Sequence, residues 1–169
     1  MSSRLPSRLP SYIEKISAIT NLAKGILPTV TGWTVAPTSL ANATDESLTT
    51  VTGEGTGQIV TVETNNVNEV TIDLGSPKAV VRIIAKVGMR KYRAIGSHSI
   101  NMRAGELDTL SDELIASAST PSITEVITYL QGSPVSTSVL VRYISLRSYD
   151  SDSAYGPYLK VYEVLVFGY

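Results

Sequence analysis

The stretch 139–169, VLVRYISLRSYDSDSAYGPYLKVYEVLVFGY, decides the fold prediction for this chain. It holds two runs rich in β-branched and aromatic residues, 139–147 and 159–167, separated by a loop of Ser, Asp, Gly and Pro. This pattern is typical of two antiparallel strands that pair with each other. We therefore expect the last run to lie inside a sheet, beside the run that precedes it.

Both runs are apolar on both faces, which predicts interior strands covered on each side. Residues 159, 161, 165 and 167 are expected to share one face, and this face also carries Glu163. The other run carries Arg142 among apolar neighbours. Because an unpaired buried charge costs several kcal/mol, Arg142 and Glu163 are expected to pair if the two strands are neighbours.

The rest of the chain after residue 31 reads as short strands separated by Gly, Pro, Asn and Ser. No segment there has helical periodicity, which excludes a doubly wound α/β fold. We predict an all-β, antiparallel jelly-roll β-sandwich over 32–169. Its further predicted strands are 32–35, 58–63, 69–74, 79–87, 99–104, 113–118 and 123–130.

Residues 1–31 are predicted to form a separate N-terminal arm and one short amphipathic helix. The sequence SRLPSRLP at 3–10 favours an extended arm, because two closely spaced prolines forbid a helix. The segment 11–24 begins with a capping-box pattern and ends before Gly25, which predicts the helix. The helix could pack on its own sandwich or on a neighbouring subunit. The residues expected to mediate assembly are Arg4, Leu5, Arg8, Leu9, Tyr12, Ile16 and Ile19.

The composition excludes several classes of protein. Among the 169 residues there is no cysteine, which excludes disulfides and thiolate metal sites. The formal net charge of −1 gives no general basic field for nucleic acid. No apolar run approaches the roughly 18 residues that a membrane-spanning helix needs. The N-terminus lacks the apolar core of a signal peptide, so we expect synthesis in a host cytoplasm without export by that route.

The order of several motifs resembles a known family. After Trp33, Pro37 and Ser39 come ATDESLTT at 43–50, VTIDLG at 70–75, VVRI at 80–83, SINMR at 99–103, VRYISL at 141–146 and VYEVLVFG at 161–168. This series resembles the discoidin or coagulation-factor type C domain, one of the galactose-binding-like β-sandwiches. The resemblance covers 32–169 and leaves the arm and helix outside.

The resemblance implies a metal site, usually for calcium, where an acidic loop meets a Glu of the last strand. Asp45, Thr50 and Glu163 match those positions. The loop departs from the family pattern at 46, 47 and 52, so backbone carbonyls would have to supply most of the six to eight oxygens that calcium takes. No cofactor is required by the sequence. The alternative is a turn at Asp45 and an ion pair of Glu163 with Arg142.

The resemblance also implies that ligands bind to loops at one end of the sandwich. One candidate loop places cations around an aromatic ring, which suits acidic sugars: Arg90, Lys91, Tyr92 and Arg93. The other offers rings for sugar faces and carboxylates for hydroxyls: Tyr149, Asp150, Asp152, Tyr155 and Tyr158. The alternative for both is a solvated loop with no ligand.

The sequence predicts no catalytic residue. His98, the only histidine, lies between two serines, but neighbours on a strand point to opposite faces and rarely form a nucleophile–base pair. The carboxylates near Asp108 lie in a polar turn, where solvated charge is the ordinary state. Nucleophile-elbow, zinc-helix and phosphate-loop motifs are missing. We therefore expect a protein that is not an enzyme.

Together these features predict a structural or interaction protein of a virion surface: a capsid decoration, spike or tail component. The arm and helix would anchor it to other particle subunits, and its loops would face host glycans. The alternative is a stand-alone carbohydrate-binding module with a structural calcium ion. Neither prediction involves nucleic acid or a membrane span.

Overall fold

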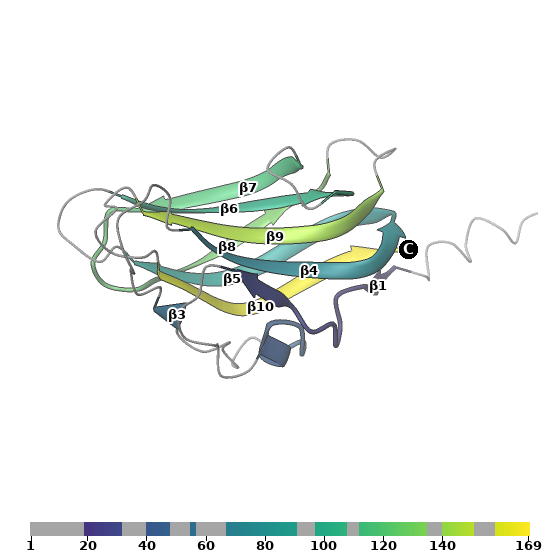
Figure 1. Cartoon of the computed structure of the whole chain (residues 1–169), viewed down its shortest axis with the longest axis horizontal. Coiled ribbons are helices and arrows are strands. Elements are labelled where there is room, and N and C mark those ends of the chain that lie inside the picture. Colours follow the sequence, from purple (N-terminus) through teal and green to yellow (C-terminus); the bar gives the residue numbers. More distant parts are fainter. Residues whose placement is uncertain are drawn as a thin grey trace, which may run out of the picture.

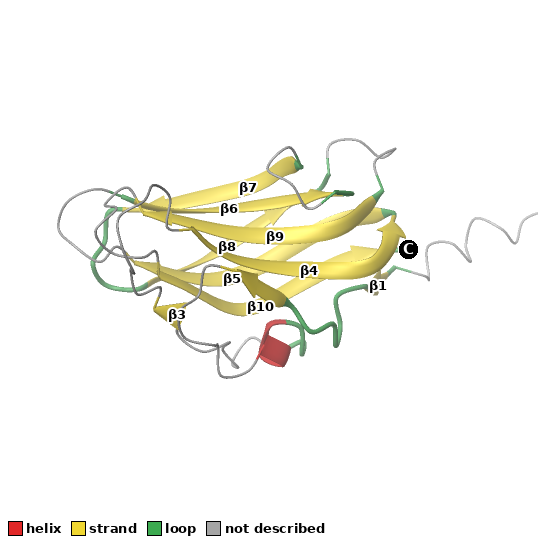
Figure 2. Ribbon diagram, in the orientation of Figure 1, coloured by secondary structure: helices red, strands yellow, loops and turns green. Residues whose placement is uncertain are grey.

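The fold is described by a computed structural model covering residues 19–31, 40–47, 55–56, 67–90, 97–107, 112–134, 140–150 and 158–169. Two antiparallel sheets pack face to face as two layers (Figures 1 and 2). Sheet A has the order β1 (Thr20–Asn21), β10 (Tyr158–Gly168), β5 (Val80–Arg90), β8 (Val126–Gly132), and β3 (Gly55–Thr56) also pairs with β10. Sheet B has the order β2 (Thr29–Thr31), β4 (Val67–Lys78), β9 (Val141–Asp150), β6 (His98–Gly105), β7 (Glu113–Thr120).

The predicted all-β jelly-roll sandwich is confirmed. Each predicted strand from 69–74 onward overlaps a strand of the structure, whereas the predicted strands 32–35 and 58–63 lie outside the described residues. A 3-10 turn, η1 (Leu40–Ala43), is the one helical element in the described part of the chain. No helix in that part has the length and apolar character needed to cross a membrane.

The core between the sheets consists of side chains that alternate along the inner strands. Ile83, Ala85 and Val87 of β5 are fully buried, and they face buried residues of sheet B such as Ile72 and Ile144. The period of two follows from the pleat of a strand, which sends successive side chains to opposite faces. The other face of each sheet is therefore left for polar and partly exposed residues.

The expected pairing of the last two long strands was wrong. β9 pairs with β4 and β6 in sheet B, whereas β10 pairs with β5, β1 and β3 in sheet A. A loop of Ser, Asp, Gly and Pro suits a crossing between two sheets as well as a hairpin, so turn chemistry alone does not select the partner. Both strands are nevertheless interior strands, as their apolar faces indicated.

A β-bulge in β10 also overturns part of the predicted face. The register against β5 shifts between Val161 and Glu163, so one extra residue occurs in β10. Leu159 and Val161 are buried before the bulge, and Glu163, Val164 and Val166 are buried after it. Residues 165 and 167 are thus half-buried on the outer face, because an inserted residue reverses which side chains point inward.

The predicted helix was wrong over its described end, residues 19–24. Asn21 lies in β1, and its Oδ1 accepts hydrogen bonds from the amides of Ala23 at 3.2 Å and Val166 at 3.0 Å. A side chain that bonds nearby backbone in this way competes with helix formation. Gly25, with φ of 72°, ends the following turn. β1 therefore adds Thr20–Asn21 to sheet A and β2 adds Thr29–Thr31 to sheet B, and 11–18 lie outside the described residues.

Candidate functional site

The described ends of both predicted ligand loops lie at one end of the sandwich. Arg90, the last residue of β5, pairs with Tyr158 at the start of β10. Tyr149 and Asp150, at the end of β9, pair with Ser99 and His98 at the start of β6. This end is opposite the C-terminus in Figure 1, since β10 runs from it to Gly168. The remaining predicted loop residues lie outside the described residues: Lys91, Tyr92, Arg93, Asp152 and Tyr155.

His98 joins the two sheets at this end. Its ring is fully buried, with Nδ1 2.5 Å from the carbonyl oxygen of Arg90 in sheet A and Nε2 2.8 Å from Oγ of Ser148 in sheet B. Because a carbonyl only accepts, Nδ1 carries the hydrogen, and in the neutral ring Nε2 accepts from the Ser148 hydroxyl. The bases of both predicted loops are therefore tied through one side chain, a role that sequence reasoning missed.

The contact between His98 and Ser148 is not arranged for nucleophilic catalysis. Both side chains are 0% exposed, so a substrate cannot reach the serine hydroxyl. A nucleophile needs its base and also an open approach for the reacting carbon. The pair serves the packing of the two sheets.

The second feature is a buried carboxylate at the bulge of β10. Glu163 is 1% exposed, and neither of its oxygens meets a donor with hydrogen-bond geometry among the described residues, although the amides of Ser47 and Val164 lie near. Burial raises the pKa of the Glu163 carboxyl to about 7, and the neighbouring Asp45 carboxyl adds to the rise. The structure thus brings Asp45 and Glu163 together, and Thr50 lies outside the described residues.

The expected ion pair between Arg142 and Glu163 was wrong. The Arg142 guanidinium binds both carboxylate oxygens of Asp73, with Nε–Oδ1 at 2.8 Å and Nη2–Oδ2 at 2.9 Å. β4 and β9 are neighbours in sheet B, whereas Glu163 belongs to sheet A. The pairing lowers the pKa of Asp73, mainly through the hydrogen bond from Arg142, and leaves Glu163 without a cationic partner of its own in the described chain.

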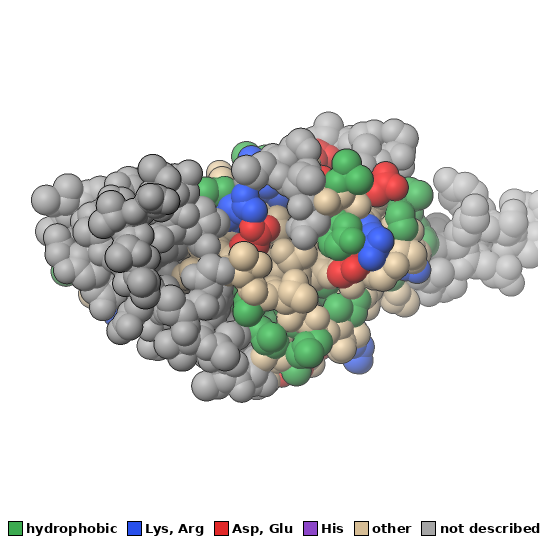
Figure 3. Space-filling view, viewed as in Figure 1, with side chains coloured by type: hydrophobic (Ala, Val, Ile, Leu, Met, Phe, Trp, Pro, Cys, Tyr) green, Lys and Arg blue, Asp and Glu red, His purple; other side chains and the backbone are tan. Residues whose placement is uncertain are grey.

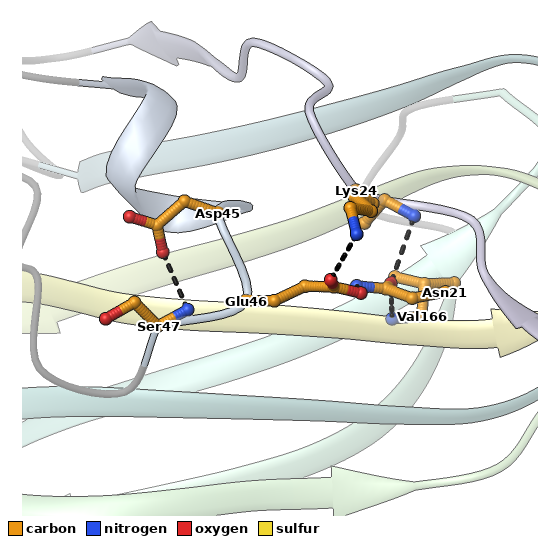
Figure 4. Close-up of polar contacts among 7 residues, drawn as sticks. Asn21, Lys24, Asp45, Glu46, Ser47 and Val166 are labelled. Carbon is orange, nitrogen blue, oxygen red and sulfur yellow. Dashed lines mark hydrogen bonds and ion pairs between the residues drawn. The ribbon is translucent and has the colours of Figure 1, made fainter.

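The loop after η1 is fastened to β10 in a way that positions Asp45 (Figure 4). The Asp45 carboxylate accepts a hydrogen bond from the Ser47 amide at 2.8 Å. Glu46, with φ of 65°, pairs with Lys24 at 2.6 Å and accepts from Asn21 Nδ2 at 3.1 Å. The hydrogen bond from Lys24 lowers the pKa of Glu46. Since Asn21 also binds the Val166 amide, the loop and the last strand are linked through one side chain.

The donor set fits a hard divalent cation in part. Two carboxylates, one of them buried, lie together at the bulge, and carboxylate oxygens are ligands that calcium prefers. The described residues contain no group of three or more His, Cys, Asp or Glu side chains around one point, so carbonyl or hydroxyl oxygens would complete the shell. The calcium ion remains a prediction.

The assembly residues are mostly not described. Ile19 alone of that set is described, and its side chain is 43% exposed just before β1. Thr20 pairs with Gly168, which places Ile19 at the end of the sandwich away from the ligand loops. The others lie outside the described residues: Arg4, Leu5, Arg8, Leu9, Tyr12 and Ile16.

Comparison with known proteins gives evidence on the fold. No protein-family model matches the chain, and no curated protein matches it in sequence. It is similar to a fucolectin from the serum of striped bass (Morone saxatilis), with a TM-score of 0.55 and 15% identity over 89% of this chain and 49% of the other. It is also similar to the family 32 carbohydrate-binding module of C. perfringens NanJ in complex with galactose, with a TM-score of 0.52 and 10% identity over 88% and 98%. The chain therefore has the fold of the galactose-binding-like β-sandwiches.

Proposed function

We propose that the protein is a non-catalytic glycan-binding module whose site is formed by the loops that follow β5 and β9. The observation that carries this proposal is the meeting of both loop bases at one end, fixed by His98. The two similar structures are a fucolectin and a module solved with galactose, which supports a sugar as ligand. Tyrosine rings would stack on sugar faces, while Arg90 and its neighbours would bind acidic groups.

We further propose that a calcium ion at Asp45 and Glu163 steadies the loop after η1 against β10. The ion would supply positive charge beside the two carboxylates, and hard oxygen ligands suit it. Asp45 comes from that loop and Glu163 from the last strand, so one ion would join the two segments. Its role here is structural.

A glycan array tests the proposed function directly. We expect the protein to bind one class of glycan in the presence of calcium, and Tyr92→Ala to weaken this binding about tenfold, since one aromatic contact contributes up to about 1.5 kcal/mol. Tyr169→Ala is the matched control, because Tyr169 is 49% exposed at the opposite end. A chelator should reduce binding. No bound glycan with or without calcium, or equal loss in both variants, would contradict the proposal.

We also propose that the module works on a virus particle, attached through the residues before β1. Ile19 is partly exposed at the end away from the ligand loops, which supports attachment at that end. A module attached at that end would present its loops outward. The residues before β1 would bind other subunits of the particle.

Light scattering tests the role of the N-terminal segment in assembly. We expect the full chain to form assemblies larger than a monomer, and a chain beginning at Ile19 to remain monomeric. The shorter chain keeps β1 and its pairing with β10, so its fold should be preserved. If both chains are monomeric over the same concentration range, the anchoring proposal is wrong.

A further inference from the structure

The outer face of sheet A carries a cluster of aromatic and charged side chains that the proposed loop site does not use. In β5 the buried residues Ile83, Ala85 and Val87 face the core, so Arg82 and Lys86 point outward. Leu130 of β8 is likewise buried, which turns its neighbour Tyr129 outward. We call this surface the sheet A face and define it by Arg82, Lys86, Glu125, Tyr129, Lys160 and Tyr162.

Contacts among these side chains hold the cluster in place. Glu125 pairs with Lys160 through Oε2 at 2.9 Å and accepts a hydrogen bond from the Tyr162 hydroxyl through Oε1 at 2.7 Å. The Lys86 ammonium lies over the Tyr162 ring, 4.7 Å from its centroid, and Lys86 is the cross-strand partner of Tyr129. The side chains of Lys160 and Glu125 are only 17% and 24% exposed. Rings and charges are thus fixed before a ligand arrives, which lowers the entropy cost of binding.

Gly88 makes room for this arrangement. A Cβ atom at this position would lie 2.6 Å from Glu125 Oε1 and 3.2 Å from Lys160 Cβ. Any larger residue would therefore push the Glu125 carboxylate off its position between β5 and β10. The open backbone at Gly88 lets one carboxylate hold both Lys160 and Tyr162.

The sheet A face is positively charged although the whole chain has a net charge of −1. It carries three cations, Arg82, Lys86 and Lys160, against the single carboxylate of Glu125. On the opposite side, sheet B carries two ion pairs, Glu69 with Arg147 and Asp73 with Arg142. Figure 3 shows blue and red side chains adjoining on that side. A local excess of positive charge attracts an anionic partner.

We infer that the sheet A face binds an extended anionic polysaccharide, as a second site apart from the loops. Tyr129 is 55% exposed, and the Lys86 ammonium lies over the Tyr162 ring two strands away, roughly 10 Å, so the Tyr129 ring and the Lys86 ammonium can meet successive parts of one sugar chain. The Glu125 carboxylate can accept hydrogen bonds from sugar hydroxyls. The choice of a polysaccharide as ligand rests on the proposed function, whereas the positive charge of the sheet A face is independent of it.

Titration calorimetry with heparin tests the inference. We expect the full chain to bind heparin at low salt, more weakly at high salt, and not to bind neutral dextran. Lys86→Gln should weaken heparin binding about tenfold, since a hydrogen bond to a charged group contributes that much or more. Tyr129→Ala should also weaken it. Lys78→Gln, which removes the same charge from β4 in sheet B, should have no effect.

Several outcomes would overturn the inference. The first is that heparin does not bind at low salt. The second is that Lys78→Gln weakens heparin binding as much as Lys86→Gln does. The third is that a single-stranded DNA oligonucleotide binds more tightly than heparin. Tyr129→Ala keeps the test decisive if Lys86→Gln fails to fold, because the Tyr129 side chain is largely exposed. Lys86→Gln should weaken heparin binding by the same factor in the wild-type chain and in Tyr92→Ala, with or without a chelator. The sheet A face can therefore fail while the loop site stands, or stand while the loop site fails.

Discussion

In a chelator at pH 8, the change Glu163→Gln is expected to raise the free energy of unfolding by about 3 kcal/mol. The wild-type carboxyl, whose pKa burial raises from 4.5 to about 7, is ionised at pH 8 in a site where the described residues supply no compensating cation. A difference of one between the folded and unfolded pKa values corresponds to about 1.4 kcal/mol of stability. A neutral amide of the same shape avoids that cost. Urea unfolding of both proteins measures the difference.

The pH dependence of the free energy of unfolding of the wild-type protein provides a second test of the Glu163 carboxyl. Below about pH 4.5 the carboxyl is protonated in both folded and unfolded chains, so the contribution of Glu163 to stability is fully present. Between about pH 4.5 and 7 the unfolded chain releases this proton first, and stability falls as the pH rises. Above pH 7 the loss is complete. Glu163→Gln should remove this fall from the wild-type curve.

Glu46→Gln is the matched control for the same loop. Its carboxyl lies on the exposed side and has a lowered pKa because of Lys24, so its contribution is present at neutral pH and lost in acid. The two variants should thus change the pH curve in opposite directions. Calcium should stabilise the wild-type protein at pH 8 and have less effect on Glu163→Gln. A Glu163→Gln protein less stable than wild type in chelator at pH 8 would show that the carboxylate is already satisfied.

The interior strands could be predicted because a strand that is buried on both sides is apolar on both faces. The runs 139–147 and 159–167 are apolar on both faces, and both strands are interior. Which sheet each strand joins depends on partners far away along the chain, and turn residues do not carry that information. The bulge after Val161 could not be predicted either, because the alternation of side chains in a run that is apolar on both faces does not show where a residue is inserted. At 19–24 strand pairing and the bonds of Asn21 replaced a helical pattern.

The candidate sites were predictable to different degrees. The position of Asp45 near Glu163 followed from the resemblance to discoidin domains, whereas the true partner of Arg142 followed only from the neighbouring strands β4 and β9. The sheet A face could not be predicted. Its residues come from three strands and the turn before β8, and alternation in one strand does not say which strands lie beside it. In each case the prediction would have required knowing which strands, far apart along the chain, pair with each other.

His98→Ala is expected to lower the free energy of unfolding by about 3 kcal/mol. Removing a fully buried ring leaves a cavity, and cavities of this kind cost about 2 to 5 kcal/mol. The change also leaves the Arg90 carbonyl and the Ser148 hydroxyl without this partner inside the protein, which adds a desolvation cost. Ser148→Ala removes one of the two hydrogen bonds and should cost about 1 kcal/mol. Ser99→Ala, next along β6 and not part of this bridge, should change stability by less than about 0.5 kcal/mol.

The same variant separates a role in stability from a role in ligand binding. Because His98 ties the base of one loop in sheet A to the base of the other in sheet B, its loss should loosen both loops and weaken glycan binding even where the protein stays folded. Binding is measured well below the midpoint of thermal unfolding of each variant. His98→Gln, which keeps one donor and one acceptor, should recover part of the affinity and of the stability. If His98→Ala is destabilised yet binds glycan as tightly as wild type, the loop bases do not depend on this bridge. The role of His98 would then be confined to stability.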